Sequence, residues 1–274
     1  RANLAKSSKS VVIFSDIHVG SKVSVCSDSP KIIDGEDYVP TKAQKALKQA
    51  WDSACTEITQ KPDITVINGE PIDGANPKSQ GSGIWSTNLI DQIRDFKVIA
   101  KKIPTSKKMI FVRGSGYHVN QGATNLEEVV AENMKADRHR AFGGSGFTDY
   151  EANIEMNGKN FNFTHHVGFS AWAQYRTTSL AREMVKLHFM RSKKGYHTDV
   201  VVRSHVHYFV SVAYPHSVGF TTPAFKFPDG FMYRSGIPSL PDVGCVEVIV
   251  ESNGDVIVKP HIVEIEFTPK VMHI

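Results

Sequence analysis

The stretch that decides the fold is residues 11–18, which read Val-Val-Ile-Phe-Ser-Asp-Ile-His. Four apolar residues, three of them β-branched, form the kind of run found in a strand that is buried on both faces. Asp16 and His18 follow at once, and their spacing lets a carboxylate and an imidazole at a strand end reach one ion. Such a pair also occurs by chance on ordinary surfaces, so a purely structural explanation stays open for it alone.

Two more apolar runs, at 64–67 and 109–112, repeat this pattern, and each ends in a turn that contains glycine. Apolar residues spaced three and four apart predict helices over 43–58 and 87–102. Thr124 and Glu127 have the spacing of a capping box, which predicts the start of a third helix. Strands alternating with helices predict a parallel sheet whose active site lies at the carboxyl ends of its strands.

The second half of the chain is patterned differently. Asn157-Gly158 and Asn253-Gly254 predict hairpins that join 149–156 to 159–164 and 245–250 to 256–265. A helix is expected over 170–191, with its core residues drawn from Trp172, Tyr175, Leu180, Met184 and Leu187. Strands are expected over 198–202 and 208–213, and an ordered loop over 222–244. The expected fold class is α/β, a two-sheet β-sandwich flanked by helices, in one domain spanning 1–274 with a C-terminal hairpin and tail over 245–274.

Composition limits the classes of function. The chain has 274 residues, 32 Lys and Arg against 28 Asp and Glu, and no long basic tract, which excludes an electrostatic nucleic-acid wrapper. Three dispersed cysteines exclude a disulfide framework and a cysteine-based zinc site, and they favour a reducing, cytoplasmic setting. No apolar window reaches the roughly 20 residues of a membrane span. A chain of this length removes roughly 75% of its unfolded surface from water, so we expect any metal to serve chemistry.

Polar residues follow the second and third predicted strands. Glu70 is placed to bridge two cations, and Asp73 is either a weaker neighbour of the site or a helix cap. Ser115 and His118 follow the third strand, where His118 is a candidate general acid or phosphate contact. An ordinary turn and an exposed loop histidine are the structural alternatives for these two segments.

Histidines follow two further strands. His165 and His166 are adjacent, so they face opposite sides of an extended chain; we expect only one to be a ligand and prefer His165. His205 and His207 stand two residues apart and are placed to bind metal side by side. The other histidines are expected in the core or on the surface: His139, His188, His197, His216, His261 and His273. Ligands after five different strands favour two adjacent divalent cations.

In this order the motifs resemble those of the calcineurin-like metallophosphoesterase superfamily, whose pattern is Asp-x-His, Gly-Asp-x-x-Asp, Gly-Asn-His, a lone His and Gly-His-x-His. The matching segments span residues 16 to 207: Asp16-Ile17-His18, Gly69-Glu70-Pro71-Ile72-Asp73, Gly114 to His118, His165 or His166, and Ser204-His205-Val206-His207. The resemblance also places the C-terminal hairpin in the second sheet of a sandwich. The sequences of residues 164–168 and 223–228 resemble those of phage and prophage members of the superfamily.

The resemblance implies a ligand set. Asp16, His18 and His207 would bind one metal, His205 with His165 or His166 would bind the other, Glu70 would bridge them, and His118 would be the catalytic histidine. Three departures matter, of which Ser204 in place of Gly is the smallest. Glu70 replaces an aspartate, and Ser115-Gly116-Tyr117-His118 replaces Asn-His, which removes an amide ligand that Ser115 replaces only weakly.

The expected function is hydrolysis of phosphate mono- or diesters by a phosphodiesterase or phosphatase with two divalent metals. Nitrogen-rich ligation favours Mn²⁺ first, and Fe, Zn²⁺ or Ni²⁺ next. The substrate is a phosphate ester, either a small molecule or nucleic acid, with no membrane and no obligate protein partner. A phage-encoded protein would act in the host cytoplasm. The alternative is a catalytically weakened module of the same fold that binds nucleotide, nucleic acid or protein.

Overall fold

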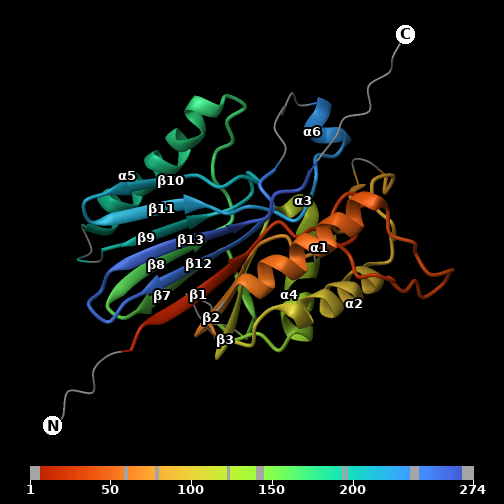
Figure 1. The fold of residues 1–274 in the computed structure, drawn as a ribbon, viewed down its shortest axis with the longest axis horizontal. Helices are drawn as coiled ribbons and strands as arrows, with labels where there is room; N and C mark the ends of the chain where they lie inside the picture. The colour runs from red at the N-terminus through yellow and green to blue at the C-terminus, as the bar shows by residue number, and fades with distance from the viewer. Residues whose placement is uncertain are drawn as a thin grey trace.

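Two β-sheets packed face to face form the centre of the molecule (Figure 1). The computed structural model describes residues 7–58, 61–77, 80–121, 124–139, 145–192, 195, 197–234 and 241–266. Helices cover the outer faces of both sheets, so the predicted α/β sandwich flanked by helices is confirmed. Within the described residues, no helix is long and apolar enough to cross a membrane.

The first sheet has the strand order β13-β12-β1-β2-β3-β6. Its bounds are β1 Lys9–Phe14, β2 Ile64–Asn68, β3 Lys108–Val112, β6 Thr148–Asp149, β12 Gly244–Val250 and β13 Val256–Ile262. β1, β2 and β3 run parallel, which confirms the predicted parallel sheet. The expectation that the C-terminal hairpin lies in the second sheet is wrong, because β12 pairs antiparallel with β1 and closes that side of the parallel strands.

The second sheet has the order β10-β11-β9-β8-β7. Its bounds are β7 Glu151–Met156, β8 Lys159–Thr164, β9 Val200–Arg203, β10 Ser211–Tyr214 and β11 Ser217–Thr221. β7 and β8 form the predicted hairpin, and both Asn157 and Gly158 have positive φ, as a tight two-residue turn requires. A small separate ladder joins β4 Asn120–Gln121 to β5 Thr124–Asn125.

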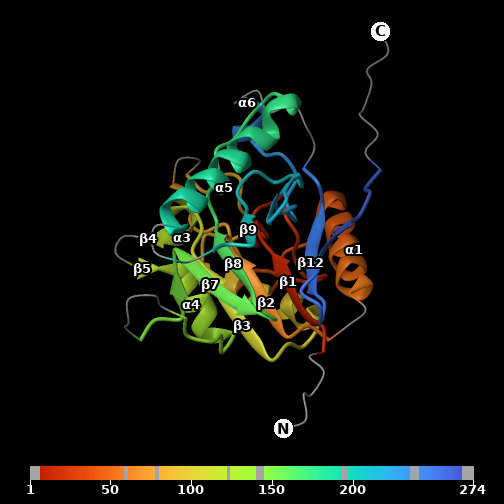
Figure 2. The same cartoon turned by 90° about the vertical axis from the view of Figure 1, so that its left-hand side faces the viewer.

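The main helices pack on opposite sides of the sandwich (Figures 1 and 2). The outer face of the first sheet carries α1 Lys42–Glu57, α2 Leu89–Ile99 with its extension η2 Ala100–Lys102, and α4 Leu126–Asn133. The second sheet carries α5 Arg176–Ser192, preceded by η3 Ala173–Tyr175. Two short helices, α3 Gly116–Val119 and α6 Gly230–Arg234, lie in loops. One core lies between the sheets, around Ile13 and Phe161, and a second lies under the helices, around Trp51 and Phe96.

Several local expectations are corrected. Asn125, not Thr124, caps α4 by accepting from the Glu128 backbone N–H, because Glu127 turns into the interior instead. α5 begins only at Arg176, so Trp172 and Tyr175 lie before it and are exposed. The expected loop over 222–244 contains α6, while its residues 235–240, like the tail 267–274, lie outside the described residues.

Candidate metal centre

The carboxyl ends of strands from both sheets meet at one edge of the sandwich. Asn68, which ends β2, donates from its side-chain amide to the Thr164 carbonyl at the end of β8 (3.1 Å) and to the Ser204 hydroxyl after β9 (2.7 Å). The Thr222 hydroxyl lies 2.7 Å from that of Ser204 and 2.6 Å from that of Ser15, which follows β1. These buried hydrogen bonds fix the loops that carry the predicted ligands.

Four of the predicted ligands form a first group there. Asp16, His18, Glu70 and His207 are all buried, and each offers one atom within 4.8 Å of the others. His18 Nε2 lies 2.8 Å from Glu70 Oε2, and His207 Nε2 lies 3.3 Å from Asp16 Oδ1. Two carboxylates and two imidazoles so arranged are a suitable donor set for a transition-metal ion.

A second group consists of Glu70, His165 and His205. His165 Nε2 lies 3.5 Å from Glu70 Oε1, so the two oxygens of that carboxylate face different histidines. His166 is exposed and belongs to neither group, although its ring centroid lies 4.3 Å from that of His205. Between the two adjacent histidines, the geometry therefore favours His165 as the ligand.

The ligands converge because their backbone is left-handed. Asp16, His18, Glu70, His205 and His207 have φ values of 48°, 52°, 58°, 75° and 58°. Only nine described residues other than glycine have positive φ, and five of them are these predicted ligands. Side chains that follow ordinary strand alternation would not need this conformation, which costs free energy and concentrates at functional sites.

Two glycines allow the loops to approach closely. A Cβ on Gly69 would lie 2.2 Å from His165 Nδ1, and one on Gly114 would lie 2.5 Å from Glu70 Cγ. Both distances are far inside contact range, so a side chain at either position would displace a predicted ligand. The glycines after β2 and β3 therefore serve the site directly.

Neighbouring groups orient the imidazoles. His165 Nδ1 lies 2.8 Å from the Asn68 carbonyl, which only accepts, so Nδ1 carries the proton and Nε2 is left as a ligand atom. His18 Nδ1 lies 2.9 Å from Asp73 Oδ1 and is held in the same way. The buried atoms His18 Nε2, His165 Nε2, His207 Nδ1 and Asp16 Oδ1 make no hydrogen bond in the described structure. Buried carboxylate oxygens and unprotonated imidazole nitrogens that accept no hydrogen bond have lone pairs available for a bound cation.

The electrostatics of the site also fit a cation. Burial alone raises the pKa of Asp16 and Glu70, but nearby imidazoles outweigh burial and hold both pKa values below their usual range. Burial lowers the pKa of His165, yet Glu70 and Asp16 together raise it to about 10. A concentrated negative charge thus favours a positive charge beside it. Burial, with the neighbouring His165 charge, lowers the pKa of His205 to about 4, which keeps its imidazole neutral as metal binding requires.

His118 stands beside the two groups and is held by Asp73. Its Nδ1 lies 2.9 Å from the Asp73 carbonyl and 3.5 Å from Asp73 Oδ1, so Nε2 is the ring nitrogen left to meet a substrate. The ring centroids of His118 and His18 are 4.7 Å apart. Asp73 also pairs with the buried Lys226, whose Nζ lies 3.4 Å from Asp73 Oδ1 and 3.0 Å from Asp229.

The remaining predicted residue, Ser115, contacts the shared carboxylate rather than standing apart from it. Its hydroxyl hydrogen-bonds Glu70 Oε1, and its backbone N–H donates to the same oxygen at 3.2 Å. Sequence reasoning missed two buried residues of the site, Lys226 and Glu127. Glu127 accepts from the backbone N–H groups of Glu70 (2.7 Å) and Gly114 (2.8 Å). A carboxylate and an ammonium inside apolar stretches were the available signals.

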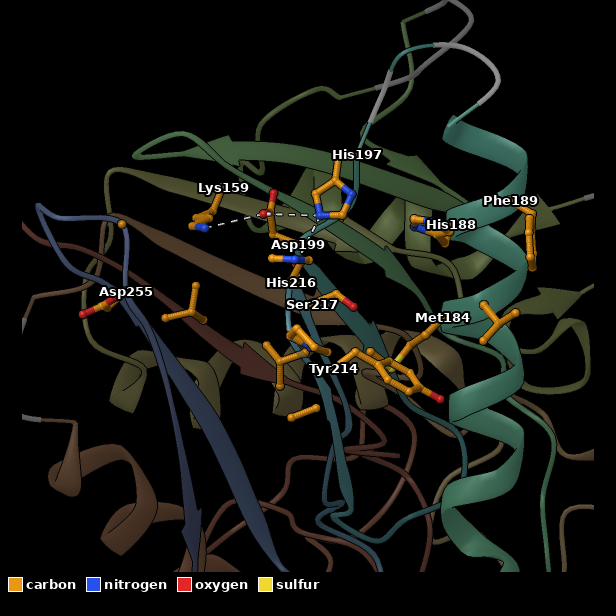
Figure 3. A pocket seen from close by; sticks show the side chains of 16 residues that line it. Lys159, Met184, His188, Phe189, His197, Asp199, Tyr214, His216, Ser217 and Asp255 are labelled. Atoms are coloured by element: carbon orange, nitrogen blue, oxygen red, sulfur yellow. Dashed lines mark hydrogen bonds and ion pairs between the residues drawn. The ribbon is translucent and has the colours of Figure 1, made fainter.

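A cavity of about 870 Å³ lies at the other end of the sandwich (Figure 3). Lys159 and His197 converge there on Asp199, at 3.6 and 3.7 Å, where β8 and β9 begin. His188 and His216 also line it, so three histidines expected in the core or on the surface are exposed together. The cavity is separate from the candidate metal centre, because β8 and β9 reach that centre with their opposite ends.

Comparison with solved structures finds proteins of similar fold at low identity. A conserved protein from Streptococcus pneumoniae TIGR4, described as a predicted phosphoesterase, is 9% identical; the match covers 94% of this chain and 99% of that one, with a TM-score of 0.38. Vps29 complexed with Zn²⁺ from Entamoeba histolytica is 10% identical over 92% of this chain and 97% of its own, with a TM-score of 0.44. An archaeal phosphodiesterase is 12% identical over 92% and 99%, with a TM-score of 0.40.

No family model matches the chain, and no curated protein matches its sequence. The two-sheet topology agrees with the α/β sandwich that the resemblance to the calcineurin-like metallophosphoesterases implies, and the resemblance itself stays a prediction. At these TM-scores the neighbours carry no argument about activity, so the function follows from the residues of this chain. The likeness to phage members stays a prediction.

Proposed function

We propose that the chain is a metal-dependent phosphoesterase that hydrolyses phosphate mono- or diesters at a dinuclear centre. The observation that carries this proposal is the carboxylate of Glu70, which belongs to both groups of buried ligands. A carboxylate shared between two sets of imidazoles is the arrangement that holds two cations side by side. When bound, such cations lower the pKa of water and neutralise the charge on phosphate oxygens.

The protein's own residues prepare the site for this chemistry. Asp73 and Asn68 fix the tautomers of His18 and His165, so that both Nε2 atoms face the carboxylates. His118, held through Nδ1, presents Nε2 to the leaving group and serves as the proton donor to its oxygen. Burial lowers the pKa of His118, and Glu70 and Asp73 partly offset that effect. In the described structure both ligand groups are largely buried, which strengthens every charge interaction within them.

The second ligand group favours an alternative in which the chain is a catalytically weakened binding module. That group offers three side chains, whereas the first group offers four. The hydroxyl of Ser115 is already hydrogen-bonded to Glu70. A site with fewer donors binds its cation less tightly. We therefore propose one tight and one weaker metal position. We propose Mn²⁺ as the preferred metal because the ligands combine imidazole nitrogens with carboxylate oxygens.

Hydrolysis assays test the proposal. Purified protein is supplied with Mn²⁺ and assayed on one phosphate monoester and one diester, beside His207→Ala and the matched control His188→Ala. His207 belongs to the first ligand group, whereas His188 lines the distant cavity. Removing a group that only supports a metal ligand lowers activity roughly 10- to 100-fold. His207 is itself a predicted ligand, so we expect the hydrolysis rate of His207→Ala to fall by more than that. We expect His188→Ala to match the wild type and a chelator to abolish hydrolysis. Equal rates for wild type and His207→Ala, or no hydrolysis by the wild type with any metal, would overturn the proposal.

A further inference from the structure

The segment that joins β8 to α5 exposes three aromatic side chains, here called the aromatic rim. Phe169, Trp172 and Tyr175 are 43%, 68% and 57% exposed. Sequence periodicity places Trp172 and Tyr175 in the core, yet the fold leaves both rings in water. Large apolar side chains gathered on one exposed segment mark a binding surface more often than isolated ones do.

The aromatic rim is anchored to the loop that carries two metal ligands. Val167 packs against Val206 and Tyr208, and the Tyr208 hydroxyl accepts a hydrogen bond from the backbone of Ser170. The Arg176 guanidinium lies 4.4 Å above the Tyr208 ring. Because Tyr208 directly follows His207, these contacts anchor both ends of the segment that carries the aromatic rim to the loop that holds His205 and His207.

Positive charge continues from the aromatic rim along α5. The helix carries four cationic side chains and one acidic one, Glu183, for a net charge of +3. Arg176 lies over Tyr208 and Arg191 pairs with Glu151. The exposed cations are therefore Arg182 and Lys186, the latter 4.0 Å from Glu183. Arg182 and Lys186 are exposed and one helical turn apart, and Arg182 stands seven residues after Tyr175. That spacing places Arg182 and Lys186 on one face of α5, and Tyr175 lies in the turn just before the helix begins. The net charge of the whole chain is only +4, so composition alone does not reveal this concentration of positive charge on α5.

We propose that the aromatic rim stacks the bases of a single-stranded nucleic acid, whose phosphates follow the cations of α5. The assignment of nucleic acid as the substrate of the metal centre rests on the proposed function. Aromatic side chains beside a basic stripe bind single strands without sequence preference, because every base offers a π-face. Duplex bases are already stacked on one another and would not cover these rings. A protein partner would cover the rings but has no need of a cationic stripe that leads to a phosphoesterase site.

Binding measurements test the aromatic rim without relying on turnover. Fluorescence anisotropy gives the Kd of a labelled eight-residue oligothymidylate and of an abasic oligonucleotide of equal length and charge, both in chelator so that nothing is hydrolysed. We expect Trp172→Ala to bind the oligothymidylate at least about tenfold more weakly and Trp172→Phe to restore most of the affinity. The abasic strand should bind wild type and Trp172→Ala equally. Tyr150→Ala, which removes a ring of similar exposure (63%) outside the aromatic rim, is the matched control and should bind as the wild type does.

Two further readouts are specific to the proposal. Trp51 is fully buried and Trp85 is 7% exposed, so base stacking should quench the fluorescence of Trp172 selectively. Arg182→Ala should lower the slope of log K against log salt concentration by about 0.7, the value for one phosphate contact on a single strand.

The outcomes separate this inference from the proposed function. Three results would overturn the inference: equal oligothymidylate affinity in wild type and Trp172→Ala, no preference for the base-bearing strand over the abasic one, or no binding at all. The absence of any binding would direct the search to protein partners. Hydrolysis of simple esters would survive any of those results. Base-dependent binding without hydrolysis of any ester would instead uphold the aromatic rim as a binding surface and overturn the phosphoesterase.

Discussion

Glu127 is the most informative residue to perturb, because its carboxylate joins the two loops that carry Glu70 and His118. It is fully buried and accepts the backbone N–H groups of Glu70 and Gly114. Burial raises its pKa to about 7, although both hydrogen bonds act in the opposite direction. These two backbone N–H groups have few other acceptors to turn to, because Glu70 has a left-handed backbone conformation and Gly114 packs against it.

Replacing Glu127 exposes the energetic value of those hydrogen bonds. Glu127→Gln keeps one acceptor oxygen and turns an NH₂ group toward the second amide, whereas Glu127→Ala leaves both amides unpaired. A buried unpaired amide costs about 1–3 kcal/mol, so we expect a loss of about 1–3 kcal/mol for Gln and about 2–6 kcal/mol for Ala. With an unfolding entropy of about 2.1 cal/mol/K per residue, 1 kcal/mol corresponds to about 1.7 °C in a chain of 274 residues. Tm should fall by about 2–5 °C for Gln and about 3–10 °C for Ala.

Calorimetry at several pH values measures these shifts. Because the folded carboxyl holds its proton more tightly than the unfolded one, its contribution to stability is fully present below pH 4.5 and is lost as the pH rises through about 7. Glu127→Gln lacks this dependence, so the Tm gap between it and the wild type should narrow between pH 5 and pH 8. Mn²⁺ affinity should also fall by about 10- to 100-fold in Glu127→Gln, because Glu70 loses its support. An unchanged Tm in Glu127→Ala, or a lower Tm in Gln than in Ala, would refute this reasoning.

Three further predictions follow from other parts of the structure. Gly69→Ala places a Cβ against His165, so elemental analysis should find about one Mn²⁺ fewer per chain, and full occupancy would contradict the predicted clash. Burial raises the pKa of Cys26 and Cys55 to about 12 and that of Cys245 well above its usual value. A thiol reagent at pH 8 should therefore label none of the three cysteines quickly in the folded protein, and all three after denaturation. Lys107, the Ser10 backbone and Lys9 outweigh the effect of burial and lower the pKa of Asp63, so its contribution to stability is lost as the pH falls below about 4. Melting curves should therefore show Asp63→Asn losing less Tm than the wild type between pH 7 and pH 3.

Much of the site follows from local pattern and a rule about sheets. Asp16, Glu70 and His205 each come directly after a buried apolar run, and the carboxyl ends of parallel strands share one edge. Adjacent histidines face opposite sides of a strand, so the preference for His165 over His166 also follows from the sequence. These inferences need only the strand period, which residue type and spacing reveal.

Other features depend on contacts between residues far apart in the chain. Nothing around Glu127 indicates that its carboxylate accepts from Glu70, 57 residues earlier, and its spacing from Thr124 suits a helix cap equally well. The left-handed conformation of Asp16 and His18 is imposed by backbone hydrogen bonds from their N–H groups to the carbonyls of Gly69 and Glu70. Trp172 has the spacing of a helical core residue, but α5 starts four residues later, so the ring stays in solvent.

The central claim is that Glu70 joins two metal positions. Mn²⁺ bound at equilibrium, counted by elemental analysis in wild type, His207→Ala and Glu70→Gln, measures this directly. We expect about two ions per wild-type chain, with the more weakly bound ion lost first on dilution, and about one ion in His207→Ala. Glu70→Gln should lose both ions under conditions that saturate the tighter site of the wild type. One ion or none in the wild type, or two in Glu70→Gln, would contradict it.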